Sequence, residues 1–538
     1  MAVRHVIVIG SGPAAAGATL AIAAHRDVRI TVVDVGGELE ADRERARLRL
    51  RALSPADWAP GDVDRVRRQP VAQGGSPLPQ KRAFGSDYPF RDFGQLDGVV
   101  ARGGANASVV SGAYGGFSTV WGAQVMPYPA ASFEAWPVSS ADMEPHYRAV
   151  LSAIPFAGVA DDLAELFPLL GEPAPLPPPA PRTAAVLAAY ERSRDRVRRA
   201  GVTVGQARLA LDAARCARCG LCMTGCPYGL VYSADQTFDA LRRSGRVDYH
   251  GGLVAYRVGE DGAAATVDVR DRRTGERRRL RADRLFVACG SMGTTRLVLG
   301  SVSAAERTVT MAESVQFMVP MGSLAPTPDP RGATEMTLNQ FNMVVSLDGD
   351  GVDLAQVHFY PYNPAVLAAL PGPLRSAVGR GVTAAILRRL TVGLGYLPSW
   401  ASPRLQVTAR PAVEEGGLPE LTVAREHPAD PPSMLRTVLA RMARVAPHLD
   451  LWPLVPEVTV AAGAKSYHFG GSFPHRTGPA GPVGDLTTDV LGRLPRWSRV
   501  HLVDGSVFPT VPAPTFTLTV MANAHRIADA VMAPARWS

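Results

Sequence analysis

Four of the chain's five cysteines are crowded into one short stretch, "CARCGLCMTGCP" at residues 216–227. Cys216, Cys219, Cys222 and Cys226 follow the spacing C-x2-C-x2-C-x3-C-P, by which bacterial ferredoxins hold iron–sulfur clusters through thiolates. Disulfides fit poorly in a chain without a secretion signal, and zinc sites more commonly pair two C-x2-C units across a longer loop. The spacing therefore favours an iron–sulfur cluster over zinc, with these four cysteines as ligands.

The cysteine spacing leaves the type of cluster open. In two-cluster ferredoxins the fourth cysteine of such a run ligates the other cluster, and this sequence has no second run. We favour a 4Fe–4S cluster, in which Cys226 turns back onto the same cluster, while three ligands would give a 3Fe–4S cluster. Cys289 as a remote fourth ligand is a weaker alternative, because "VACG" has the pattern of a buried strand, where a free cysteine is ordinary.

A strand-to-helix turn near the N-terminus carries the residues of a nucleotide-binding fold. "VIVIGSGPAAAGATLAIAA" is a β-branched strand that leads into Gly10, Gly12 and Ala15 and then into an alanine-rich helix. Gly10 permits the tight turn, Gly12 lets the backbone approach a pyrophosphate, and Ala15 keeps the helix close to the strand. A second strand, "VRITVVD", ends at Asp34, which is placed to accept hydrogen bonds from a ribose. These features in this order predict a dinucleotide site.

Further glycine-rich stretches occur at 111–124, 285–301 and 500–532. Together with "WPVSSADMEPHY" and "SYHFGGS", they resemble the glucose-methanol-choline family of FAD-dependent alcohol oxidoreductases, and the resemblance follows the family's order along the chain. It implies FAD rather than NAD as the cofactor. It also implies an α/β fold, α+β overall, with a Rossmann-like FAD-binding domain assembled from discontinuous segments and a substrate-binding domain built on an antiparallel sheet.

The resemblance also assigns cofactor contacts residue by residue. The flavin and its phosphates would be approached by one loop, with Gly115, Gly116, Ser118 and Gly122. The adenine would lie near Val254, and the ribityl chain and pyrophosphate would lie by the turn at Asp504 and Gly505. Val120 stands where pyranose oxidases carry a histidine bonded to the flavin, and because valine cannot form that bond we expect noncovalent FAD.

Oxidation of an alcohol by hydride transfer requires a base for the hydroxyl proton. His468 in "KSYHFGGSFPH" stands where the family motif places its base, ahead of a Gly-Gly-Ser turn. The family usually adds a second histidine or asparagine on the C-terminal loop, where this chain has Thr515, with Phe516 in place of the proline. Threonine can hydrogen-bond but is no base near neutral pH. We therefore assign catalysis to His468, with Thr515 as a second contact, and expect His475 to have a surface or packing role.

Between the glycine-rich segments the pattern changes to strands without intervening helices, except at 364–390. In "AQVHFYPY" the alternation places Gln356, His358 and Tyr360 on one face of a strand, and Gln316 and Asn342 could join them from neighbouring strands. Such a face could bind a hydroxylated substrate or be an ordinary solvated face.

The predicted organisation is an FAD-binding first part (1–155), a proline-rich linker (171–182), an FAD-binding second part (183–310) with the cysteine loop (214–230), a substrate-binding antiparallel sheet (311–450) and an FAD-binding C-terminal part (451–538).

The net charge of +8 comes from scattered arginines and does not indicate a nucleic-acid partner. No uncharged apolar stretch reaches the length of a membrane span, and the N-terminal apolar run is too short for a secretory signal, so a cytoplasmic protein is expected.

We predict a dehydrogenase that oxidises a sugar, polyol, aminocyclitol-type sugar or other small alcohol and passes electrons through the cluster to a ferredoxin, cytochrome or quinone. The alternatives are an oxidase that uses oxygen with a structural metal site, and an electron-transfer protein without alcohol chemistry.

Overall fold

The computed structural model describes most of the chain. The described residues are 4–67, 81–91, 99–107, 109–303, 305–348, 353–362, 380–412, 414, 416–426, 431–479, 481–482 and 484–533.

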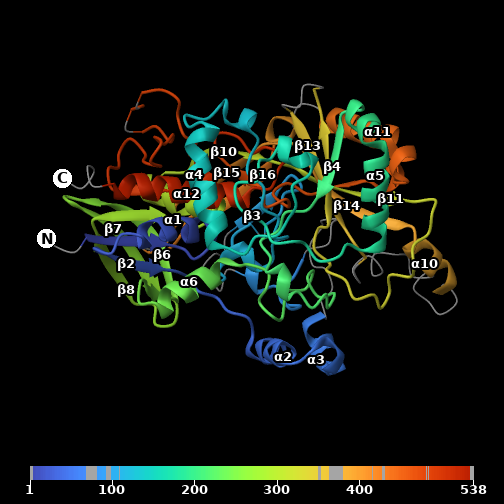
Figure 1. Ribbon diagram of the computed structural model, residues 1–538. Helices are drawn as coiled ribbons and strands as arrows, with labels where there is room; N and C mark the ends of the chain where they lie inside the picture. The colour runs from blue at the N-terminus through green and yellow to red at the C-terminus, as the bar shows by residue number, and fades with distance from the viewer. Residues whose placement is uncertain are drawn as a thin grey trace.

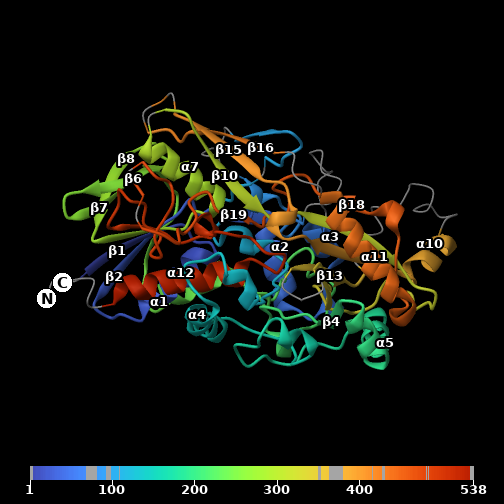
Figure 2. The ribbon, with the colours of Figure 1, turned by 90° about the horizontal axis from the view of Figure 1, so that it is seen from above.

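A five-stranded parallel sheet forms one end of the molecule, with its strands contributed by segments far apart in the sequence (Figure 1). The strand order is β20, β9, β1, β2 and β5, and the apolar side chains of the central strand β1 are buried. Helices α1 and α12 run side by side against this sheet (Figure 2), so closely that a Cβ at Gly17 would lie 2.2 Å from the carbonyl oxygen of Met521. This architecture confirms the predicted α/β class built from discontinuous segments. The elements are β1 (Arg4–Ile9), α1 (Pro13–Ala23), β2 (Val28–Val33), β5 (Asp248–His250), β9 (Arg284–Val287), β20 (Val500–Leu502) and α12 (Thr517–Met532).

A three-stranded antiparallel sheet lies next to the parallel sheet. It consists of β6 (Leu253–Asp261), β7 (Ala264–Asp271) and β8 (Arg277–Ala282). Strand β8 is rich in arginine, and Arg279 pairs with Asp268 of β7 across the strands at 2.6 Å. Helix α7 (Ser291–Val302) packs against β6 and begins directly after the loop that follows β9.

The other end of the molecule is built on a seven-stranded sheet. Its main path runs β17, β11, β14, β13, β12 and β4, with β18 paired to β11, and neighbouring strands are antiparallel. Helices α5 and α11 cover one face of this sheet, where buried aliphatic and phenylalanine side chains form the core. The elements are α5 (Pro181–Arg199), β4 (Val202–Gln206), β11 (Gln316–Gly322), β12 (Phe341–Ser346), β13 (Leu354–Tyr360), β14 (Leu390–Tyr396), α11 (Pro431–Leu449), β17 (Trp452–Pro453) and β18 (Thr459–Val460).

The strands predicted in the 311–450 region divide between two sheets rather than forming one. The chain leaves β10 at Glu313 and enters β11 at Gln316, which belongs to the seven-stranded sheet. The second sheet has the order β19, β10, β15, β16 and β3, and it is antiparallel except where β3 joins β16. Its strands are β3 (Val99–Arg102), β10 (Arg307–Glu313), β15 (Leu405–Arg410), β16 (Glu420–Arg425) and β19 (Phe469–Gly470).

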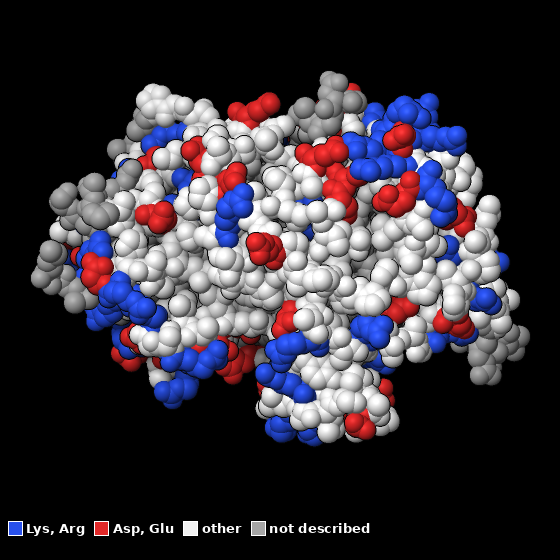
Figure 3. All heavy atoms as spheres, in the orientation of Figure 1, with Lys and Arg blue, Asp and Glu red and all other residues white. Residues whose placement is uncertain are grey.

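A pair of helices, α2 (Ala41–Ala52) and α3 (Pro60–Arg67), projects from the body of the molecule (Figure 1). Their apolar side chains pack on Leu221 of the cysteine loop, and Trp58 stacks on Tyr228 with ring centroids 6.0 Å apart. Basic and acidic side chains are interspersed on this projection and over the rest of the face shown in Figure 3. This agrees with the scattered arginines in the sequence.

The predicted helical segment 364–390 is described only in part. Residues 364–379 lie outside the described residues, and the remainder contains α10 (Arg380–Leu387) and the start of β14. Within the described ranges, every helix is too short or too polar to cross a lipid bilayer.

Candidate functional site

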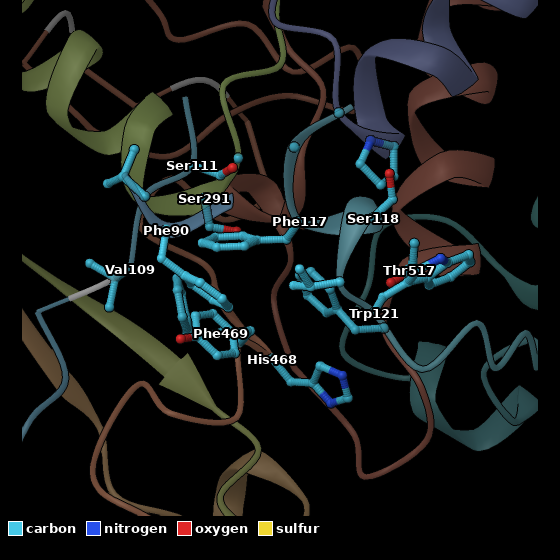
Figure 4. A pocket seen from close by; sticks show the side chains of 18 of the residues that line it. Phe90, Val109, Ser111, Phe117, Ser118, Trp121, Ser291, His468, Phe469 and Thr517 are labelled. Atoms are coloured by element: carbon cyan, nitrogen blue, oxygen red, sulfur yellow. The ribbon is translucent and has the colours of Figure 1, made fainter. Parts of the chain in front are cut away.

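A cavity of about 850 Å³ begins at the carboxyl ends of the parallel strands and extends to the seven-stranded sheet. One end is lined by Gly10, Gly12 and Asp34, and the other by Tyr396 and His468. Figure 4 shows aromatic side chains around the cavity, among them Phe90, Phe117 and Phe469, with the ring of His468 projecting into it. The two sets of residues predicted from distant parts of the sequence therefore share one continuous space.

At the first end, backbone atoms form a close-fitting cradle. Gly10 has φ +106°, and a Cβ there would lie 2.5 Å from the carbonyl oxygen of Ala288. Gly12 precedes α1 and gives the helix no side-chain cap, and Pro13 has no N–H, so Ala14 and Ala15 carry the first amide donors of the helix, and these have no partner within it. A Cβ at Gly116 would lie 3.2 Å from the Cα of Gly12. The missing Cβ atoms at Gly10 and Gly116 therefore let these loops pack closely against neighbouring backbone at the cavity wall.

Asp34 lies where β2 ends, as the sequence predicted. Its carboxylate accepts hydrogen bonds from Ser11 Oγ at 2.5 Å and from the Tyr249 hydroxyl at 2.9 Å. Ser11 Oγ also accepts from the amide of Gly115 at 3.0 Å, which joins the two glycine-rich loops. Burial raises the pKa of Asp34 to about 6, against the lowering effect of these hydrogen bonds. The carboxylate is therefore held in a fixed orientation at the cavity wall.

The remaining predicted cofactor residues divide into wall residues and supports. The two supports are Ala15, which is fully buried where α1 meets the sheet, and Gly115, which has φ +92° and starts the turn before Gly116. Asp504 is buried and accepts from the Thr294 hydroxyl and from the Ser506 amide, and burial raises the pKa of its carboxyl. The wall residues are Gly10, Gly12, Asp34, Gly116, Ser118, Gly122, Val254, Asp504 and Gly505. Val120 also lies in the wall.

His468 lies at the second end, just before β19. Its ring stacks on Tyr396 at 4.7 Å between centroids and on Phe516 at 5.9 Å. Nδ1 is buried and has no hydrogen-bond partner among the described residues. Burial lowers the pKa of His468 to about 4. The imidazole is therefore neutral near pH 7 and can accept a proton.

The structure places the C-terminal loop differently from what the motif suggested. Thr515 is buried, its hydroxyl has no hydrogen-bond partner among the described residues, and its neighbours Phe516 and Thr517 line the cavity instead. The catalytic role of Thr515 stays a prediction. His475 lies in the core, where it contacts the Thr488 hydroxyl at 3.0 Å.

The predicted polar strand face does not form the cavity wall as a unit. Gln316 and Tyr360 line the cavity, whereas Gln356, His358 and Asn342 are buried elsewhere in the sheet. The side-chain nitrogen Nε2 of Gln124 lies 2.9 Å from Asn342 Oδ1 and 3.2 Å from His358 Nε2. These side chains are turned toward the loop that carries Gln124, so they form a buried hydrogen-bonded network rather than a substrate-binding or solvated face.

Two strands supply a largely apolar wall that the sequence did not reveal. Alternate residues of β11 and β14 point into the cavity, and their register pairs Gln316 with Tyr396 and Met318 with Leu394. Tyr396, which positions the His468 ring, was also missed. Only the period-2 pattern of "LTVGLGY" could have indicated it, since the stacking partner is distant in sequence.

The cysteine loop adjoins the cavity through Met223. Burial raises the pKa of Cys216, Cys219 and Cys222, and the neighbouring loop thiolates raise it further. The thiols are thus near one another, yet within the described ranges no group of three or more His, Cys, Asp or Glu residues is arranged to hold a metal ion. Cys289 lines the opposite end of the cavity, beside the glycine cradle. The iron–sulfur cluster stays a prediction from the sequence.

Comparison with known proteins shows similarity of fold. No protein-family model and no curated protein matches the chain. Among solved structures, pyridoxine 4-oxidase from Mesorbium loti is 13% identical, with a TM-score of 0.58 and 98% of each chain covered. Formate oxidase is 12% identical, with a TM-score of 0.62 and 99% of each chain covered. The likeness extends over the whole of all three chains.

Proposed function

We propose that this protein is an FAD-dependent oxidoreductase that oxidises the alcohol group of a small molecule, with His468 as the base. The observation that carries the proposal is the single cavity that joins the glycine cradle to His468. The sequence motifs of the glucose-methanol-choline family support it. So does the similarity of fold to two proteins named as oxidases.

The residues at the cradle fit FAD. Gly10, Gly12 and Gly116 allow a pyrophosphate to approach the backbone, and the uncapped start of α1 offers amide donors to it. Asp34 offers a carboxylate to the adenosine ribose, and Val254 lies in the wall near that end. Val120 offers no nucleophile for a covalent link, so we expect the cofactor to be held noncovalently.

The chain's own groups account for the proton chemistry. When bound, FAD would supply the acceptor for a hydride from the alcohol carbon. His468 is neutral because burial lowers its pKa, so it can take the hydroxyl proton as the carbon is oxidised. The rings of Tyr396 and Phe516 fix the orientation of the imidazole and keep water from its faces. The Ser466 hydroxyl accepts from the His468 amide at 3.1 Å and holds the backbone in place.

Anaerobic stopped-flow reduction of the bound flavin by a panel of alcohols tests this assignment. Replacement of a positioned base costs about a hundredfold to ten-thousandfold in rate, so His468→Ala should slow flavin reduction by that factor. His146→Gln is a matched control, because His146 is a partly buried histidine outside the cavity. Equal rates in the wild type and His468→Ala would contradict the role of His468. Flavin that no alcohol of the panel reduces would favour an electron-transfer protein without alcohol chemistry.

Two electron acceptors are consistent with the proposal. The contact of the cysteine loop with the cavity, through Met223, favours a one-electron acceptor. The two similar solved structures are named as oxidases, which favours oxygen. Anaerobic purification with iron, sulfide and flavin quantified on one sample separates these alternatives. Iron and sulfide that disappear in Cys219→Ser while FAD stays bound would support the relay. Rapid reoxidation in air with release of peroxide, from a sample without iron, would support the oxidase.

A further inference from the structure

Lys465 lies three residues before His468 and lines the same cavity. Its side chain is 6% exposed. It belongs to the loop that runs from β18 past β11 to β19, and the Lys465 amide donates to the carbonyl of Ala462 at 3.1 Å. The loop therefore fixes the backbone of Lys465 close to the reacting end of the cavity.

The ammonium group of Lys465 has no compensating partner in the described part of the chain. No carboxylate lies within ion-pair distance of it and no acceptor within hydrogen-bond distance; the ring of Tyr467, with its centroid 5.8 Å away, is its one recorded contact. Burial and, to a smaller extent, the charge of Arg82 lower the pKa of Lys465 to about 8. The group is thus still mostly protonated near pH 7. A buried charge without a partner is costly, which indicates that a ligand supplies the missing anion.

Lys81 provides an internal comparison. It is a second buried lysine in the wall of the same cavity, but its Nζ donates to the carbonyl of Trp121 at 2.5 Å. Lys81 is therefore satisfied by the protein, whereas Lys465 is not. Arg296 also lines this cavity and its Nε donates to the carbonyl of Pro419 at 2.5 Å, so Lys465 is the wall cation whose head group has no protein acceptor among the described residues.

The wall that leads away from His468 is apolar. From Tyr396 toward the start of β14, the inward-facing residues are Leu394, Val392 and Leu390, and β11 adds Met318 and Pro320 beside them. Six residues of a β-strand span roughly 20 Å. The polar residues beside this run are Gln316, Tyr360, Thr459 and Glu457, and the apolar run from Leu394 to Leu390 itself fits an extended hydrocarbon chain.

We propose that Lys465 binds an anionic group of the substrate, and that the substrate is an apolar hydroxy acid whose hydrocarbon part lies along β11 and β14. This inference rests on the proposed alcohol oxidation and narrows its substrate class from the sugars and polyols expected from the sequence. The same positive charge could instead serve an anionic oxygen of FAD, and the experiment is designed to distinguish these sources.

Isothermal titration calorimetry of the FAD-loaded protein with octanoate and with octanamide tests the proposal. The two probes share a hydrocarbon chain and differ in charge, and a charge-assisted hydrogen bond favours octanoate by about tenfold or more. In Lys465→Met the preference should fall to about twofold or less, with octanamide affinity unchanged. Lys465→Arg keeps the charge and should keep most of the preference. Because calorimetry requires no turnover, a failure of the oxidation chemistry would leave this result intact.

Three results would overturn the proposal. The first is equal affinity of the wild type for the two probes. The second is an octanoate preference that persists in Lys465→Met, or that is lost in Lys81→Met instead. The third is a Lys465→Met variant that binds FAD more weakly or shifts the flavin midpoint potential while still preferring octanoate, which would assign the charge to the cofactor.

Discussion

The two ends of the cavity differ in whether their buried ionisable groups have hydrogen-bond partners in the protein. At the glycine cradle, Asp34 and Asp504 are each held by hydrogen bonds from neighbouring side chains or amides. At the other end, the Nδ1 atom of His468 and the ammonium of Lys465 have no such partners in the described residues. Buried polar groups in folded proteins are normally paired, so unpaired ones mark positions where a ligand completes the structure. The backbone fixes the shape of the glycine cradle before any ligand binds. At the other end, these groups of His468 and Lys465 obtain hydrogen-bond partners only from a ligand.

The largest effect should come from a substitution that distorts the glycine cradle and so weakens FAD binding. Gly10→Ala places a Cβ 2.5 Å from the carbonyl oxygen of Ala288 and forces alanine into φ +106°. Relief of this strain would displace the cradle backbone, and a loss of about 1–3 kcal/mol of binding free energy would weaken FAD binding by about fivefold to 150-fold. Fluorescence titration of the FAD-free protein measures this affinity. Gly61→Ala, where a Cβ meets open space, should bind FAD like the wild type, and a Gly10→Ala variant with wild-type affinity would show that the cradle does not hold the cofactor.

A smaller effect should follow from removal of the aromatic ring that packs on His468. Tyr396→Leu removes the ring that stacks on His468, and an aromatic pair is worth about 0.5–1.5 kcal/mol, so flavin reduction should slow by about two- to tenfold. Tyr396→Phe keeps the ring and loses only the hydroxyl that accepts from Gln316 Nε2 at 2.9 Å. Stopped-flow reduction should therefore rank the wild type and Tyr396→Phe above Tyr396→Leu. If Tyr396→Phe is as slow as Tyr396→Leu, the hydroxyl and not the stacking is what matters.

A third effect, on folding stability and not on binding or rate, is a pH dependence at Asp34. Burial raises the pKa of Asp34 to about 6, above the value of about 3.9 in an unfolded chain. Between these pH values the folded FAD-free protein binds more protons than the unfolded chain, so its free energy of unfolding should fall as the pH rises from about 4 to about 7. In Asp34→Asn this fall should be smaller by about 1–3 kcal/mol. Urea unfolding at both pH values measures it, and an equal or larger fall in Asp34→Asn would contradict the assigned pKa.

The same contrast explains what could be predicted from the sequence. The cradle is local, because Gly10, Gly12 and the end of β2 lie within one strand–helix–strand unit, and its glycines are required by backbone geometry. Most of the other cofactor residues rested on family motifs and lie in the cavity wall. His468 was found in the same way, since its position is marked by the glycines that follow it.

The rest depends on contacts between strands distant in sequence. Period-2 alternation placed Gln356, His358 and Tyr360 on one face but could not say that Tyr360 lines the cavity while His358 contacts Gln124 behind Tyr396. The partition of the 311–450 strands into two sheets depends on the turn between Glu313 and Gln316. Lys465 resembles any surface lysine until the fold buries it without a counter-charge. The cysteine spacing predicts a ligand set, but spacing does not fix how the thiols are oriented.

A crystal structure of the FAD-loaded protein tests the central claim, that one cavity joins a nucleotide cradle to an alcohol-oxidising end. The account predicts the pyrophosphate against Gly10, Gly12 and Gly116, the adenosine by Asp34 and Val254, and the flavin ring within contact distance of the His468 side chain. A structure in which the adenosine lies at His468, or in which the flavin ring lies outside the space between His468 and the cradle, would contradict it.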